Sequence, residues 1–176
     1  SEPGQHNIDS DYRVVISEAD VDLLSPFKLR PEMLEIAQKT TRGIHNSYDK
    51  AKTLFDYVDT KISYGDTKRT NGIRDSEEVF LTQEGICSEL TFLYVAMARS
   101  VGLRAGYAHV DVDYAGDKVN HACAVVDLGR DVLADVAYHK FDVAHLDWYK
   151  LDDMQAIDNF RRVRSLDERL KAAQKK

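Results

Sequence analysis

The chain has 176 residues, of which 43% are hydrophobic and 31% charged, the composition of a water-soluble globular domain. Its net charge of −6 and the lack of a long basic stripe argue against nucleic acid or an anionic membrane as a partner. No apolar run reaches the roughly 18 residues that a membrane helix needs. Two cysteines are too few for a disulfide scaffold or a cysteine-rich zinc site.

The sequence predicts helices in its first half. Residues 12–27 mix a short strand signal with a turn before Pro26. Residues 31–41 begin with a proline, which is favoured at the first position of a helix, and residues 47–63 predict a second helix with Ser47 as its cap. A charged, glycine-containing loop follows and leads into a short helix near residues 75–82. We interpret the run "DTKRT" in this loop as solvated. If the loop formed the rim of a cleft, its basic side chains could select acidic substrates.

The second half predicts one buried helix and then strands. Residues 88–101 are almost all apolar or small, so this helix should lie inside the domain, and Gly102 should end it. Strand-like segments follow at about 103–113, 120–127 and 131–138. Residues 151–174 predict a C-terminal helix with a thin apolar stripe through Met154, Ile157, Phe160 and Leu170. This order indicates an α+β fold in a single domain over residues 1–176, with helices, a buried central helix and an antiparallel meander.

Three residues in successive elements carry the chemistry. Cys87 opens the buried helix, where the positive end of the helix dipole would stabilise a thiolate and the amides could help an oxyanion to form. His121 begins the predicted strand at about residues 120–127. Asp135 lies in the predicted strand at about 131–138, which is too apolar for a carboxylate without a partner. Each residue alone is more typical of a core or capping position. Together they supply a thiol, a base and an orienting acceptor.

The segments "GICSELTFLYVAMARSVGLRAGYAHV", "NHACAVV" and "LADVAY" resemble the core of the transglutaminase-like superfamily, relatives of papain-like cysteine enzymes. The resemblance covers about residues 48–140. The positions that fit it are Gly85, Cys87, Arg99, Gly102, Arg104, His121, Ala122 and Asp135. It implies a transglutaminase-like core, with the nucleophile's helix packed on an antiparallel sheet, and a Cys87–His121–Asp135 triad that attacks amide carbonyls through a thioester.

The chain departs from the family's pattern at two positions. Cys123 stands where the family often has a tryptophan after His-Ala, and Val136 stands where a proline commonly follows the aspartate. The single tryptophan, Trp148, lies beyond the triad. We expect Cys123 to share the strand face of His121, to line the cleft and to stay reduced. The resemblance also points to an upstream aromatic residue as the second oxyanion donor, which makes Tyr64 the first candidate and Gln83 the second.

The geometry of the triad requires a particular strand register. His121 and Asp135 must lie on one face of the sheet, which a three-residue connection at residues 128–130 allows and a two-residue turn forbids. We therefore predict that Asp127 pairs with Asp131, with Gly129 or Arg130 at positive φ. Two other signals are discounted. Residues 111–117, "DVDYAGD", are a poor calcium loop and indicate a polar hairpin, and His139 and His145 lack a zinc-binding motif, so surface or structural roles are favoured.

These observations predict a cysteine hydrolase, a peptidase or amidase that acts on a protein or peptide and needs no cofactor or metal. The alternatives are a protein-glutamine acyltransferase, a peptide N-glycanase-like amidase, and a non-catalytic protein-interaction domain. Residues 1–13 show no signal-peptide pattern, so the cytoplasm is the expected location, although a removed signal peptide would leave no trace. The sequence does not indicate an oligomeric state.

Overall fold

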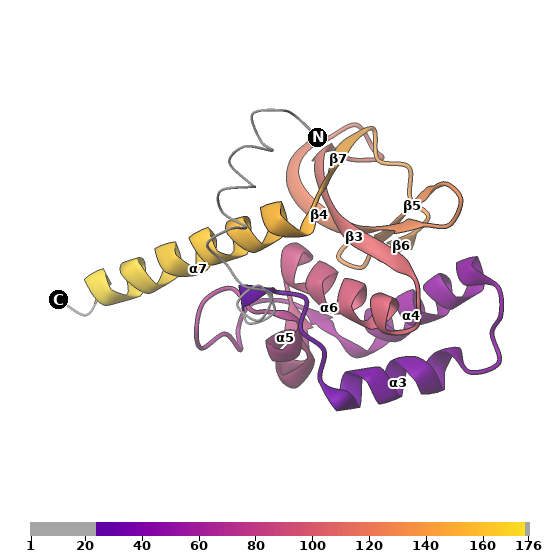
Figure 1. Ribbon diagram of the computed structural model, residues 1–176. Helices are drawn as coiled ribbons and strands as arrows, with labels where there is room; N and C mark the ends of the chain where they lie inside the picture. Colours follow the sequence, from indigo (N-terminus) through magenta and orange to yellow (C-terminus); the bar gives the residue numbers. More distant parts are fainter. Residues whose placement is uncertain (1–23, 175–176) are drawn as a thin grey trace.

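The computed structural model describes residues 24–174 and consists of a helical layer packed against an antiparallel sheet (Figure 1). The helices are α3 (Pro31–Thr41), α4 (Ser47–Lys61), α5 (Ser76–Thr82), α6 (Cys87–Ser100) and α7 (Asp153–Gln174). The predicted α+β class is confirmed. The strand signal expected before Pro26 falls on residues outside the described range. None of the helices within that range has a stretch apolar enough to cross a lipid bilayer.

Local signals explain where the helices begin. Pro31 occupies the start of α3, as predicted. The cap of α4 is Asn46, whose side-chain oxygen accepts a hydrogen bond from the backbone N–H of Asp49, so the predicted Ser47 cap was wrong by one residue. Asparagine and serine cap helices about equally well, and the sequence offers both side by side.

Helix α6 is the centre of the hydrophobic core. Every residue from Glu89 to Ala98 is buried, which agrees with the prediction of a helix that is apolar nearly all round. Helices α3, α4 and α5 contact it, and strands β3 (Arg104–Val112) and β4 (Lys118–Asp127) also pack against it. Each fully enclosed aliphatic side chain of α6 contributes roughly 1.5–3 kcal/mol to folding. Burial therefore fixes the direction of this helix and, with it, the place of Cys87 at its first position.

The five-stranded sheet has the order β6-β5-β4-β3-β7. Its other members are β5 (Asp131–Asp135), β6 (Lys140–Phe141) and β7 (Asp147–Leu151). Strands β3, β4 and β5 form the predicted meander. Strand β6 extends it and β7 returns to pair with the free edge of β3, and neither of these two strands was predicted. A separate parallel pair joins β1 (Ser63–Tyr64) to β2 (Glu84–Gly85), immediately before α6.

The register between β4 and β5 is the predicted one. Asp127 pairs with Asp131, and Gly129 in the intervening loop has a φ of 90°. The N–H of Gly129 donates to the Asp127 carboxylate, which stabilises the turn. Strand β5 ends at Asp135 rather than at residue 138, because the chain turns at Val136–His139, where the N–H of His139 donates to the carbonyl of Val136.

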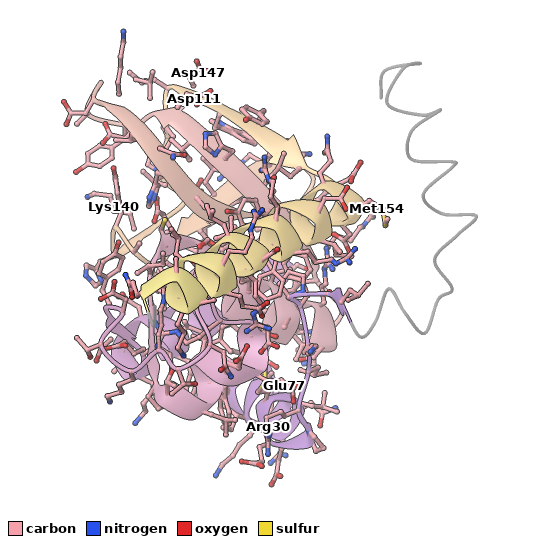
Figure 2. All side chains as sticks on the ribbon, turned by 90° about the vertical axis from the view of Figure 1, so that its left-hand side faces the viewer. Arg30, Glu77, Asp111, Lys140, Asp147 and Met154 are labelled. Atoms are coloured by element: carbon pink, nitrogen blue, oxygen red, sulfur yellow. The ribbon has the colours of Figure 1, made fainter. Side chains whose placement is uncertain are left out.

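Helix α7 lies across the boundary between the sheet and the other helices (Figure 2). Its first half is held by the buried side chains of Met154, Ile157 and Phe160, as predicted. Leu170 was wrongly assigned to this apolar stripe, since it is 54% exposed on the second half of the helix.

Polar contacts hold the second half of α7 against the loop of residues 66–74. The carboxylate of Asp167 accepts the N–H of Ile73, and Lys171 donates to the carbonyl of Thr70. Gly72 has a φ of 77°, and a Cβ placed there would lie 2.8 Å from the Asp167 side chain. Glycine is therefore required where the loop meets the helix.

A buried cluster of charges joins this loop to the start of α6. The guanidinium of Arg74, which is 2% exposed, donates to both carboxylate oxygens of the fully buried Glu89 at 3.0 Å and to Glu84 at 3.0 Å. It also donates to the carbonyl of Gly65 at 2.8 Å. One cation thus connects the loop, the β1–β2 pair and α6.

We expect the substitution Arg74→Met to lower the free energy of unfolding by about 3–5 kcal/mol, because it leaves the Glu89 and Glu84 carboxylates without their buried partner. Urea denaturation at neutral pH measures this loss. The matched control is Arg130→Met, which removes an exposed pair with Asp142 and should change the free energy of unfolding far less. Equal losses in the two variants would contradict the structural role of the buried cluster.

Candidate active site

Cys87 lies at the first position of α6 and is partly exposed. The N–H of Ile86, the residue before it, donates to the Glu89 carboxylate at 2.9 Å, which fixes the approach of the chain to the helix. Gly85 permits close packing there, since a Cβ would lie 3.2–3.3 Å from Glu89, Leu90 and Val79. The thiol is consequently presented by a rigid helix start, next to first-turn amides that have no partner inside the helix.

His121 and Asp135 lie close together on neighbouring strands. His121 begins the buried part of β4, and Asp135 is the last residue of β5 and fully buried. Nε2 of His121 lies 2.7 Å from Oδ2 of Asp135. The three-residue loop at the β4–β5 turn makes this contact possible, because it puts both side chains on one face.

The charge state of His121 is set by its neighbours. Burial lowers the pKa of its imidazole, but the hydrogen bonds with Asp135 and with Cys87, together with their negative charges, raise that pKa to about 9. The ring is thus an imidazolium at neutral pH. Cys87 and His121 line the same cleft and influence each other electrostatically, and His121 contacts Asp135, so the thiol, the imidazole and the carboxylate are neighbours.

Tyr138 closes the site from the side of the β5–β6 turn. Its ring stacks on His121 with 4.4 Å between the ring centroids, and its N–H donates to Oδ1 of Asp135 at 3.0 Å. Its hydroxyl donates to Asp113 at 2.8 Å. The sequence analysis did not identify this residue, since nothing in the pattern "ADVAYHKF" separates it from a packing tyrosine.

Asp113 belongs to the segment that was predicted to be a polar hairpin. Its Oδ1 accepts the N–H groups of Ala115 and Asp117, which stabilises the β3–β4 turn. Both carboxylate oxygens are therefore occupied by donors of the protein, an arrangement of a turn and not of a calcium loop.

His145, for which the sequence favoured a surface or structural role, is buried beside Asp135. It is buried in the segment between β6 and β7, and its Nε2 lies 2.7 Å from the same Oδ2 of Asp135 that contacts His121. Its Nδ1 accepts the backbone N–H of Tyr114 at 3.0 Å. Neither a motif nor periodicity marks this histidine, because its position depends on the β7 strand returning to β3.

Three of these side chains also meet the spacing of a metal site. One ligand atom each of His121, Asp135 and His145 lies within 4.8 Å of the others, and this is the single such group in the described part of the chain. The N–H of Tyr114, however, requires a lone pair on Nδ1 of His145, which assigns the proton to Nε2. An Nε2–H directed at the carboxylate fits a hydrogen-bonded group better than a metal ligand.

A cleft of about 600 Å³ opens onto Cys87 and His121. Its walls come from the start of α6, from β3 and β7, and from α7. The aromatic side chains that line it include Phe92, Tyr107, Tyr149 and Phe160, and Arg69, Arg162 and Asp167 provide charge. The cleft is therefore lined by both aromatic and charged side chains.

Cys123 does not line this cleft, contrary to the prediction. It is 1% exposed and packs with Ala108, Val110, Val125 and Leu133, against which Trp148 also packs. The apolar cover of this sheet face encloses the sulfur, and burial raises the pKa of the Cys123 thiol well above its usual range. Both cysteines are free.

The two candidates for the second oxyanion donor are placed differently. Tyr64 pairs with Gly85 in the β1–β2 ladder, and the pKa of its phenol is raised by burial and then by the nearby charge of Cys87. Gln83 ends α5 in a left-handed conformation, and its side-chain amide donates to the carbonyl of Phe80 at 2.6 Å. The structure thus brings Tyr64 towards Cys87 and occupies the amide of Gln83 elsewhere.

The buried helix with a cysteine at its start and the antiparallel sheet with a histidine and an aspartate define a transglutaminase-like, papain-like α+β architecture. The family model of the transglutaminase-like superfamily matches residues 34–152. The chain belongs to this superfamily, and the match extends beyond residues 48–140, where the resemblance was first identified. No curated protein matches the chain.

One solved structure shows the same fold, and two others are similar over part of their length. A candidate cysteine protease from Cytophaga hutchinsonii is 15% identical with a TM-score of 0.55, covering 78% of this chain and 56% of its own. A candidate protease from Parabacteroides distasonis is 14% identical (TM-score 0.46, 72% of this chain, 30% of that one). A protein described as a TGase is 19% identical (TM-score 0.44, 76% and 36%). The chain thus spans little more than half of the first of these proteins and about a third of the other two.

The raised pKa of His121 predicts a pH-dependent contribution to stability. In the folded chain this pKa is about 9, against 6.5 for a free histidine. The stabilisation is therefore complete below about pH 6.5 and is lost as the pH rises through 9. We expect the difference in unfolding free energy between the wild type and His121→Gln to shrink over this window, as measured by urea denaturation at several pH values.

His45→Gln, at an exposed histidine before α4, is the control for the loss of an imidazole as such. A difference between the wild type and His121→Gln that stays constant from pH 6 to pH 9.5 would contradict the raised pKa.

Proposed function

We propose that the protein is a cysteine hydrolase, a peptidase or amidase that cleaves an amide bond of a protein or peptide through a thioester. The observation that carries this proposal is the line of contacts from Cys87 to His121 to Asp135 at the end of a cleft. A thiol, a base and an orienting carboxylate in this order are the requirements of nucleophilic catalysis on a carbonyl.

The first half of the reaction forms the thioester. The proton of the Cys87 thiol passes to His121, and the sulfur, at the positive end of α6, attacks the carbonyl carbon of the substrate. The electron pair of the C=O bond moves to oxygen. When the tetrahedral intermediate collapses, the C–N bond breaks and His121 gives its proton to the leaving amine.

The second half releases the acid. Neutral His121 accepts a proton from water, the resulting hydroxide attacks the thioester carbon, and the C–S bond breaks to regenerate the thiolate and imidazolium. The partial exposure of Cys87 in the cleft supports hydrolysis, because water can reach the thioester. Asp135 holds Nε2–H of His121, which leaves Nδ1 as the ring nitrogen available to the sulfur.

Incubation of a glutamine-containing peptide with and without a primary amine distinguishes hydrolysis from acyl transfer. Mass spectrometry should find glutamate, or a cleaved backbone, in both reactions. A product that carries the added amine as its main form would replace hydrolysis with transglutaminase activity. A deglycosylated asparagine in a glycopeptide would indicate peptide N-glycanase-like chemistry.

The reactive thiol is predicted to be Cys87. Iodoacetamide at neutral pH should label it much faster than Cys123, which is buried and protonated, and peptide mapping measures the ratio. Cys87→Ala should abolish turnover, and Asp135→Asn should impair it without unfolding the chain.

Cys123→Ala is the matched control and should retain most of the activity, since it removes one buried sulfur outside the cleft. Equal labelling of the two cysteines would contradict the assignment of the nucleophile. A Cys87 that does not react with small electrophiles would instead favour a protein-interaction domain.

Tyr64 is predicted to donate the second hydrogen bond to the oxyanion, beside the N–H of Cys87. Tyr64→Phe should lower kcat by about 100-fold with little change in KM, because this contact forms only as the oxyanion develops. Gln83→Asn is the control, since asparagine tolerates the left-handed conformation there. Steady-state kinetics that show a full kcat in Tyr64→Phe would remove this residue from the oxyanion site.

A further inference from the structure

A second histidine binds the carboxylate that orients the catalytic base. We propose that His145 is a positioning residue, which shares Oδ2 of Asp135 with His121 and thereby limits how strongly the carboxylate holds the His121 proton. This inference rests on the proposed function of the site and extends the line of contacts from three residues to four.

The backbone fixes the tautomer of His145. Its side chain has no exposed surface, and the N–H of Tyr114 donates to its Nδ1 at 3.0 Å. A nitrogen that accepts a hydrogen bond carries no proton, so the proton of the ring is on Nε2. Nε2–H therefore donates to Asp135 at 2.7 Å, and the ring cannot turn over without losing both bonds.

The N–H of Tyr114, which donates to Nδ1 of His145, is itself held in place. Asp113 closes the β3–β4 turn through the N–H groups of Ala115 and Asp117, and the N–H of Leu146 donates to the carbonyl of Val112. The turn that presents Tyr114 and the segment that carries His145 are thus bound to the same end of β3. The polar hairpin "DVDYAGD" consequently helps to orient His145 through the N–H of Tyr114.

Asp135 receives three donors and has no freedom to rotate. The N–H of Tyr138 binds Oδ1, and the two imidazoles bind Oδ2 at equal distances of 2.7 Å. A carboxylate oxygen that accepts hydrogen bonds from two donors attracts each donor less strongly than it would attract a single one. His145 therefore draws charge away from the contact with His121.

The groups that face His121 are the thiol of Cys87, the carboxylate of Asp135, and the rings of Tyr138 and His145. Cys87 and Asp135 supply the negative charge, and the hydroxyl of Tyr138 is bound to Asp113. Among these neighbours only His145 competes for the same acceptor atom. Its removal should leave His121 with a stronger hold on its proton, which helps the ion pair to form but slows proton transfer to the leaving amine.

The experiment follows the titration of His121 by NMR in protein with labelled histidine. His145→Leu removes both hydrogen bonds, and the pKa of His121 should rise by about one pH unit, the scale of one hydrogen bond to a charged group. His145→Gln offers an amide that can donate to Asp135 and accept from Tyr114, so it should restore the wild-type titration. His45→Leu and His45→Gln, at an exposed histidine, are the matched controls and should leave the titration unchanged.

An unchanged or lowered pKa of His121 in folded His145→Leu overturns the proposal, because His145 would then contribute only packing. If His145→Leu does not fold, the wild type and His145→Gln still decide. Nitrogen chemical shifts report the tautomer of each ring, and a proton on Nδ1 of His145 overturns the proposal directly. These readouts do not need turnover, so an unreactive Cys87 would refute the proposed function and leave this test intact.

Discussion

The ion pair between Arg74 and Glu89 is the interaction on which the site depends most. Glu89 is fully buried at the third position of α6, where it accepts hydrogen bonds from the backbone of Ile86 and from the guanidinium of Arg74. The same guanidinium binds the carbonyl of Gly65, next to the candidate oxyanion donor Tyr64. One charge pair thus sets the position of the nucleophile and that of the residue expected to stabilise the developing oxyanion.

Two carboxylates, Glu89 at the helix start and Asp135 at the sheet, each collect several hydrogen-bond donors, but the two clusters have different roles in the proposed reaction. At the helix start, several donors converge on the carboxylate of Glu89, and no part of this cluster needs to change its charge during the reaction. At the sheet, donors converge on Asp135, and in the proposed reaction one of them, His121, gains and loses a proton in every cycle. The first cluster fixes geometry, whereas the second adjusts acidity, and the fold keeps them on separate elements.

The sequence allowed the prediction of the fold class, the buried helix and the register between β4 and β5. Each of these follows from local information, such as the apolar run around Leu93 and Tyr94 or the glycine at 129. It did not reveal strand β7, the contact of His145 with Asp135, or the apolar side chains that cover Cys123. These three features share one cause, which is the return of β7 to the free edge of β3. The position of His145, just before β7, and the packing of Trp148, within β7, against the cluster around Cys123 both depend on this pairing. A pairing over such a separation leaves no periodic pattern in the chain.

Helix α7 gives the cleft one of its walls, yet its residues, 153–174, lie beyond the 34–152 that match the superfamily. One wall of the cleft therefore belongs to a different segment from Cys87, His121 and Asp135. Substitutions along α7 can alter which side chains fit beside Cys87 while Cys87, His121 and Asp135 keep their contacts. Under the proposed function, selection for a new substrate could proceed on this helix alone, with the reaction itself inherited unchanged.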